Sequence, residues 1–148
     1  MDITKAFVAA FERKIEKHWE KIYVAVDIHD TILKACYEEK ETYAFFPHAL
    51  EALRKLSDRK DICMILWTAC HPGPLADYLA RFEQEGVHFD YVNSNPEVSN
   101  TALNNFDGKL YFNVGLDDKF GFEGDKDWEA VIDVLEKYHL PITNQPQL

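Results

Sequence analysis

Residues 22–31 read IYVAVDIHDT, an almost unbroken apolar run that is rich in Val and Ile and stops at an aspartate. Residues 62–67, which read ICMILW, form a second run of the same kind. Continuous apolar runs of this length are typical of parallel strands that are covered on both faces. We therefore expect two central parallel strands, one over residues 22–28 and one over residues 62–67.

Segments with apolar residues at helical spacing alternate with these strands. An amphipathic helix is predicted over residues 4–20, two more are expected to begin at Pro47 and Pro74, and a last one is predicted over residues 128–138. Gly86 is expected to end the helix that begins at Pro74. Shorter strands are predicted over residues 89–92 and 110–116. This alternation predicts an α/β fold with an open, parallel, Rossmann-like sheet, helices on both faces and an extra N-terminal helix.

The length and composition of the chain limit its architecture and its partners. Its 148 residues suit one domain, divided into an N-terminal helix (1–20), a core (21–139) and a tail (140–148). The formal net charge of −10 disfavours nucleic acid and anionic membranes as partners. No apolar run reaches the roughly 18 residues that a membrane span needs, and no secretion signal is recognisable, so we expect a cytoplasmic protein. Three cysteines without Cys-x-x-Cys spacing argue against disulfides and a structural zinc site; they are Cys36, Cys63 and Cys70.

Polar residues follow the predicted strands at the edge where parallel sheets bind their ligands. The first strand leads into Asp27, the second into Thr68 and the fourth into Asp117 and Asp118, and Lys109 comes just before the fourth strand. Carboxylates gathered at one edge repel one another unless a cation lies among them, and their oxygens suit Mg²⁺. A carboxylate at a strand end can also attack phosphorus and form an aspartyl phosphate, while Mg²⁺, Lys and hydroxyl groups neutralise the phosphoryl oxygens. These residue types therefore suit phosphoryl transfer.

The order Asp27, Thr68, Lys109 and Asp117-Asp118 resembles the four motifs of the haloacid dehalogenase superfamily of phosphohydrolases. The resemblance covers residues 21–139 and points to a small subgroup without cap domains. It implies a strand order of 3-2-1-4, with Asp27 as the nucleophile and a Mg²⁺ ligand. It further implies that Asp117, Asp118 and the backbone carbonyl of His29 complete the metal site, that Thr68 and Lys109 hold the phosphate, and that Thr31 locks the loop.

One position departs from the family pattern Asp-x-Asp-Gly-Thr. The second aspartate, which gives a proton to the leaving group, is replaced by His29, and the glycine is replaced by Asp30. Three alternatives follow: His29 itself acts as acid and base, Asp30 takes over that role, or the site binds metal and phosphate without turnover. Asp30, Thr31 and His71 are further candidates for contact with the substrate.

Two functions are therefore expected. The first is a Mg²⁺-dependent phosphohydrolase that acts on a phosphate monoester through an aspartyl phosphate. The second is a weakly active or inactive module that binds a metal, a phosphorylated ligand or a partner. Because the insertions between the core elements are short, we expect an open site that accepts a phosphorylated small molecule or a phosphate presented on a larger molecule.

Two apolar regions outside the core have alternative roles. The flap over residues 33–46 contains aromatic side chains that would either contact the leaving group or pack against the N-terminal helix; they are Tyr37, Tyr43, Phe45 and Phe46. The N-terminal helix would form a homodimer if Phe7, Phe11 and Trp19 were exposed. Burial of these side chains on the chain's own sheet would argue against that dimer.

Overall fold

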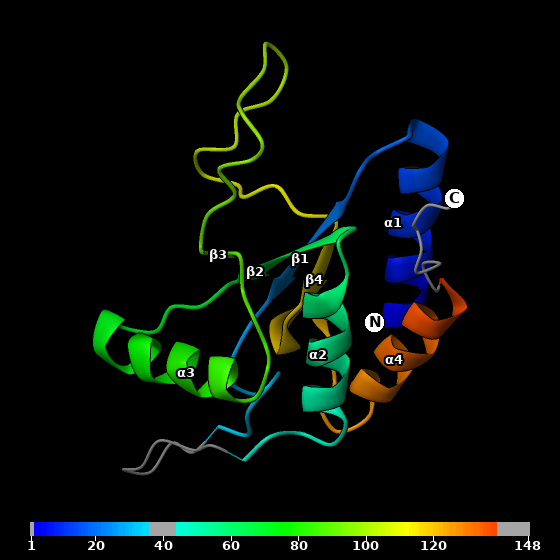
Figure 1. The fold of residues 1–148 in the computed structure, drawn as a ribbon. Helices are drawn as coiled ribbons and strands as arrows, with labels where there is room; N and C mark the ends of the chain where they lie inside the picture. Colours follow the sequence, from blue (N-terminus) through cyan, green and yellow to red (C-terminus); the bar gives the residue numbers. More distant parts are fainter. Residues whose placement is uncertain (1, 36–43, 139–148) are drawn as a thin grey trace.

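Four short parallel strands run through the middle of the molecule (Figure 1). In this computed structural model, which describes residues 2–35 and 44–138, the strands are β1 (Ile22–Val26), β2 (Ile62–Leu66), β3 (Tyr91–Val92) and β4 (Val114–Leu116). The order β3-β2-β1-β4 confirms the predicted open parallel sheet. The two central strands pair along their whole length, from Ile22 opposite Ile62 to Val26 opposite Leu66.

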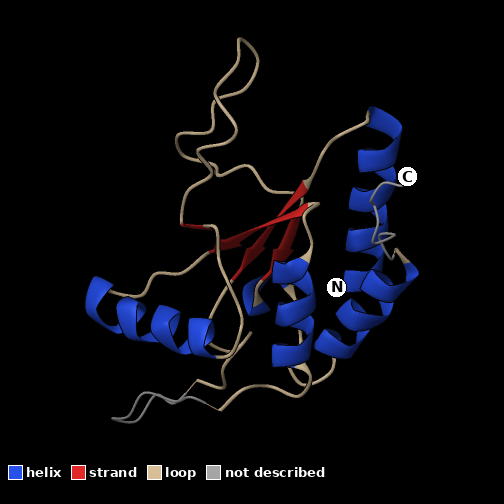
Figure 2. Cartoon of the chain, viewed as in Figure 1, coloured by secondary structure: helices blue, strands red, loops and turns tan. Residues whose placement is uncertain are grey.

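Four α-helices surround this sheet (Figure 2). They are α1 (Ile3–Lys17), α2 (Ala49–Asp58), α3 (Pro72–Gln84) and α4 (Asp127–Lys137), and a short 3-10 helix, η1 (Asp118–Phe120), follows β4. Pro72, rather than the predicted Pro74, is the first residue of α3, because proline at the first helical position forfeits only a hydrogen bond that the helix lacks there anyway. Gly86 follows α3 with a φ of 80°, as a helix stop requires.

The two edge strands are shorter than predicted because an acidic or amide side chain replaces part of each ladder. Beside β4, the backbone N–H of Tyr23 donates to the side-chain oxygen of Asn113 over 2.7 Å. Beside β3, the backbone N–H of Met64 donates to the carboxylate of Asp90 over 2.8 Å. Regular pairing therefore begins only after each of these residues, and residues 110–113 are not a strand.

The two faces of the sheet are covered differently. Alternate residues of β1 (Ile22, Val24 and Val26) are buried in the main hydrophobic core, to which α1, α2 and α4 also contribute. The intervening Tyr23 is half-buried and contacts Tyr111 edge-on at 5.8 Å between ring centroids. Tyr111 belongs to the long loop 93–113 between β3 and β4, which Figure 1 shows reaching away from the sheet. We call this loop the arm.

The apolar face of α1 is buried within the chain. Phe7 is 0% exposed and Phe11 is 2% exposed, and Phe11 stacks on Tyr138 at 4.8 Å. Trp19 is half-buried. Phe7 and Phe11 are therefore buried within the chain, and this burial argues against a homodimer through α1.

None of the helices in the described part of the chain is long and apolar enough to cross a membrane.

Candidate active site

The carboxyl ends of β1, β2 and β4 meet at one edge of the sheet. The backbone N–H of Asp27 donates to the carbonyl of Leu116 over 2.9 Å, and that of Trp67 donates to the carbonyl of Val26 over 2.8 Å. These bonds extend the pairing one residue past the strands and bring the following side chains to a common hollow of about 430 Å³. Its lining residues are Asp27, Trp67, Thr68, Ala69, Asn93, Asp117 and Lys119.

Three carboxylates converge beside this hollow. One carboxylate oxygen from each of Asp27, Asp117 and Asp118 lies within 4.8 Å of the other two. Burial, and next the charge of Asp117, raise the pKa of Asp27 to about 7, although the hydroxyl of Thr31 opposes this shift. Burial also raises the pKa of Asp117. The protein therefore holds its carboxylates together at an electrostatic cost that a bound cation would remove.

The donor set fits Mg²⁺. Carboxylate oxygens are hard ligands, and the cluster contains neither a thiolate nor an imidazole that would favour zinc. Asp117 uses one oxygen to accept a hydrogen bond from the backbone N–H of Lys119 over 2.8 Å, which fixes the orientation of its other oxygen. Asp27, Asp117 and Asp118 are thus the residues that would hold the ion.

Thr31 ties the loop after β1 to the loop after β4. Its side-chain hydroxyl donates to Asp27 Oδ2 over 3.1 Å and accepts from the backbone N–H of Asp118 over 3.1 Å. Its carbonyl accepts a 2.8 Å hydrogen bond from the indole of Trp128. Since Thr31 is fully buried and does not line the hollow, these contacts suit the loop-locking role rather than contact with a substrate.

His29 and Asp30 are engaged away from the hollow. His29 Nε2 lies 3.0 Å from the hydroxyl of Tyr78 in α3, and the two rings meet at 82°. Asp30 has a φ of 61°, and its carboxylate accepts from the backbone N–H of Ala35 over 3.1 Å. An aspartate tolerates this left-handed conformation, which favours glycine, better than most residues do. Neither side chain lines the hollow beside Asp27.

Thr68 and Asn93 form one side of the hollow. The side-chain amide of Asn93 accepts from the backbone N–H of Thr68 and donates to its carbonyl, both over 2.8 Å. The hydroxyl of Thr68 accepts from the backbone N–H of Cys70 over 3.1 Å. Its own hydrogen can still be donated, as binding of a phosphoryl oxygen requires.

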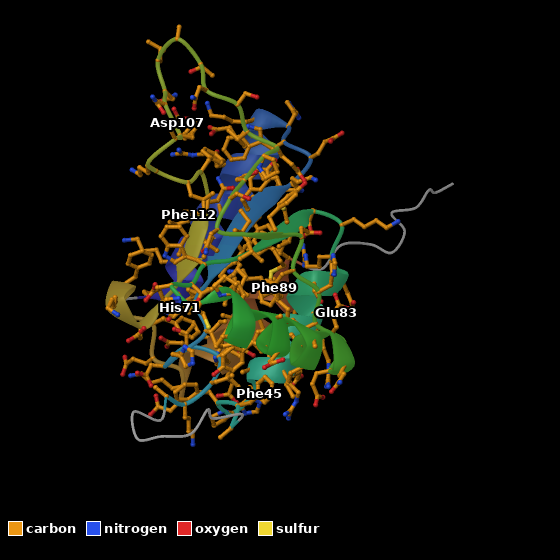
Figure 3. The ribbon with its side chains drawn as sticks, turned by 90° about the vertical axis from the view of Figure 1, so that its left-hand side faces the viewer. Phe45, His71, Glu83, Phe89, Asp107 and Phe112 are labelled. Atoms are coloured by element: carbon orange, nitrogen blue, oxygen red, sulfur yellow. The ribbon has the colours of Figure 1, made fainter. Side chains whose placement is uncertain are left out.

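Lys109 is not brought to the hollow. It is exposed on the arm and lines a separate hollow with residues 104–106 and 110–112, because β4 begins only at Val114. Lys119, two residues after Asp117, lines the hollow of Asp27 instead. His71, which is labelled in Figure 3, is exposed just before α3. It is not among the residues that line the hollow of Asp27 either.

Besides Ala69, three lining residues with larger side chains were not singled out from the sequence: Trp67, Asn93 and Lys119. All three lie at or just after strand ends, so the rule that located Asp27 and Thr68 could have located them as well.

The flap is described only in part, and its ends pack on the body of the protein. Tyr37 and Tyr43 lie outside the described residues. Phe45 contacts Phe82 of α3 with ring centroids 6.2 Å apart, and Phe46 lies against Gly124. Packing is therefore the role that the structure shows for these two rings, but against α3 and the loop before α4 rather than against α1.

Comparisons with known proteins bear on the fold alone. No protein-family model matches the chain, and no curated protein matches it. A solved structure from Bacteroides thetaiotaomicron, described as that of a conserved protein coded by a locus of this organism, is similar with a TM-score of 0.61. The two chains are 23% identical, and the match covers 86% of this chain and 99% of that chain. This similarity supports the arrangement of sheet and helices and says nothing about activity.

Proposed function

We propose that the chain is a Mg²⁺-dependent phosphohydrolase of the haloacid dehalogenase type, which cleaves a phosphate monoester through an aspartyl phosphate on Asp27. The observation that carries this proposal is the convergence of three carboxylates within 4.8 Å at the end of β1, beside a hollow that Thr68 and Lys119 line. A nucleophile, a cation site and two donors for phosphoryl oxygens are thereby close together.

The contacts of Asp27 suit it to nucleophilic attack. Thr31 holds Asp27 Oδ2, so Oδ1 is the oxygen that attacks phosphorus. A bond forms between Oδ1 and phosphorus, the bond to the ester oxygen breaks, and the departing alkoxide takes up a proton from the general acid or from solvent water. A water molecule then attacks the phosphorus of the aspartyl phosphate and returns a proton to the same group or to solvent, which releases inorganic phosphate and the free carboxylate. A bound Mg²⁺ supplies charge neutralisation for the nucleophile and the phosphoryl oxygens.

Lys119 and Thr68 would hold the phosphate during this reaction. The ammonium group of Lys119, which follows β4, supplies a positive charge. The hydroxyl of Thr68, which follows β2 on the other side of β1, supplies a hydrogen-bond donor. Lys119 thus takes the role that the family resemblance gave to Lys109. We propose that the substrate is a phosphorylated small molecule or a phosphate presented on a larger molecule, and that the protein acts in the cytoplasm.

A second function is favoured by the contact between His29 and Tyr78. This contact directs the imidazole to α3, and Asp30 is bound to its own loop. If neither side chain reaches the leaving group, the site binds metal and phosphate with little turnover. Of the two candidate proton donors, His29 and Asp30, His29 requires the smaller change, since rotation of one side chain would free it from Tyr78.

The leaving group of the substrate distinguishes these functions. We expect Mg²⁺-dependent hydrolysis of 4-nitrophenyl phosphate, whose leaving group needs little protonation, and loss of this activity in Asp27→Asn. If His29 is the acid, His29→Ala lowers the rate for glycerol phosphate about 10²- to 10⁴-fold and the rate for the aryl ester much less. The matched control is Asp125→Asn, the same change at an exposed residue outside the site.

Each outcome assigns one function. Mg²⁺-dependent turnover that disappears in Asp27→Asn but persists in Asp125→Asn supports the phosphohydrolase. Absence of Mg²⁺-dependent turnover with both esters, while Mg²⁺ and phosphate still bind to the wild type, contradicts it and supports the binding module.

A further inference from the structure

A second hollow of about 470 Å³ adjoins the hollow that contains Asp27. Trp67 and Asn93 line both, so the two are continuous along the carboxyl ends of β2 and β3. The remaining wall comes from the two limbs of the arm, residues 94–100 and 106–111. A phosphate ester bound at Asp27 would therefore project its organic part toward the arm.

The wall that the arm contributes is braced by its own hydrogen bonds. Asn95 Nδ2 donates to the carbonyl of Tyr111 over 2.9 Å, and Asn100 Nδ2 donates to Asp107 Oδ1 over 3.0 Å, so both bonds join one limb to the other. Glu97 fastens the arm to the sheet, since it accepts hydrogen bonds from Lys21 and Tyr91 over 2.9 and 2.7 Å. The second hollow is thus preformed, as is usual for small-molecule sites.

The lining of the second hollow is aromatic, polar and nearly uncharged. Trp67 is 37% exposed, so the indole presents a large ring surface at the junction of the two hollows. Ser94, Asn95 and Asn100 add neutral hydrogen-bonding groups. Asp107 is the only charged residue among the described residues that line this hollow. Each asparagine NH₂ group has two hydrogens and uses one of them in the bonds that brace the arm.

We propose that this second hollow binds the leaving group of the substrate, and that this group is an uncharged, hydroxyl-bearing ring, as in a sugar monophosphate or a nucleoside monophosphate. This inference rests on the proposed function. The ring packs against the indole of Trp67, and its hydroxyl groups bond to the amides of the arm. The carboxylate of Asp107 repels a second phosphate or a carboxylate on the same molecule, so the site selects against doubly anionic substrates.

Ratios of kcat/KM between matched substrates test this selectivity. A hexose 6-phosphate and a ribonucleoside 5′-monophosphate distinguish the two possible rings, a hexose 1,6-bisphosphate adds the second charge, and acetyl phosphate lacks a ring. We expect the better ring monophosphate to exceed the bisphosphate by at least about tenfold, and Asp107→Asn to reduce that ratio at least about fivefold. Trp67→Ala is expected to lower the ratio of ring monophosphate to acetyl phosphate about tenfold.

Leu103→Ser is the control, because Leu103 is on the same arm, 93% exposed, and lines neither hollow. It should leave both ratios unchanged. Equal use of monophosphate and bisphosphate, or a ring preference that survives Trp67→Ala, overturns the proposal.

A binding measurement separates failure of this proposal from failure of the proposed function. If no ester is hydrolysed, the phosphohydrolase is contradicted, and tryptophan fluorescence is then titrated with the same ring monophosphates in the presence of Mg²⁺. Saturable quenching in the wild type that is absent in Trp67→Phe supports the second hollow as the ring site. Absence of quenching in the wild type, or the same quenching in Trp67→Phe, overturns it.

Discussion

Burial and a neighbouring negative charge both raise the pKa of Asp27. Its pKa rises from 3.8 to about 7, first because the carboxyl group is buried and next because of the charge of Asp117. Between these two pH values the folded, metal-free protein binds a proton that the unfolded chain has released. The free energy of unfolding therefore falls as pH rises through this window, and this loss is complete above the folded-state pKa.

Asp27→Asn removes that unfavourable charge. In EDTA at pH 8, we expect the variant to be more stable than the wild type by about 1–3 kcal/mol, allowing for partial screening by solvent, and the difference should vanish near pH 4. Urea unfolding at both pH values measures this. The raised pKa of Asp27 would be contradicted if the variant were less stable than the wild type at pH 8. It would also be contradicted if the gain in stability over the wild type were as large at pH 4 as at pH 8.

Thr31 is the residue through which the two acidic loops depend on each other. Thr31→Val deprives Asp27 of a donor and the backbone N–H of Asp118 of an acceptor, so we expect a loss of about 1–3 kcal/mol in the free energy of unfolding. Mg²⁺ affinity, measured by calorimetry, should fall about 10- to 100-fold. Thr31→Ser keeps the hydroxyl and should keep the affinity; equal affinity in all three proteins would show that Thr31 does not orient the cluster.

The site could be predicted from the sequence where a residue directly follows a strand. Asp27, Thr68 and Asp117 converge as expected because parallel strands end at the same edge. Lys109 was placed there by its motif position, yet it lies five positions before Val114, where β4 begins. The sequence could not predict side-chain orientation either. The spacing of His29 from Asp27 does not reveal that the hydroxyl of Tyr78, 49 residues away, contacts the imidazole of His29.

At the scale of the elements, the loop between η1 and α4 lies close against Phe46 at Gly124. A Cβ atom on Gly124 would lie 2.7 Å from the ring of Phe46. Gly124→Ala should therefore cost about 1–3 kcal/mol in the free energy of unfolding, measured in urea, because the ring must move. Gly73→Ala is the matched control: apart from its chain neighbours and the backbone of its own helix, no atom lies within 4 Å of the added methyl group, and the substitution should be neutral or slightly stabilising. Equal effects of the two substitutions would contradict this packing.

A strand could be predicted from the sequence where all or nearly all of its residues are buried. The apolar runs of β1 and β2 identified the central strands because every residue of β2 and four of five in β1 are buried. The edge strands were overestimated because Asp90 and Asn113 supply side-chain oxygens to the ladder, which an apolar pattern does not reveal. The first residue of α3 was missed because Pro72 and Pro74 are both compatible with a helix start.

For the whole molecule, the alternation of elements predicted an open parallel sheet and the family resemblance implied its strand order, but neither predicted the path of the arm. The crossover through α2 places β2 beside β1, and the crossover through α3 places β3 beside β2. The return to the other edge of β1 then adds β4 and completes the order β3-β2-β1-β4. The arm makes that return without a helix. Its position depends on Glu97, whose hydrogen bonds reach Lys21 and Tyr23, more than 70 residues earlier in the chain. Contacts of this range leave no local signal in the sequence.

Trapping of a phosphoryl mimic tests most directly whether Asp27 is a phosphoryl acceptor in a Mg²⁺ site. Fluoroberyllate binds to a carboxylate as phosphate would and requires no proton donor for a leaving group, so the result does not depend on His29. With Mg²⁺, fluorine NMR should show protein-bound resonances in the wild type and in Asp125→Asn that are absent in Asp27→Asn and after removal of Mg²⁺. Bound resonances that persist in Asp27→Asn, or their absence from the wild type, would contradict the assignment of Asp27 as the nucleophile.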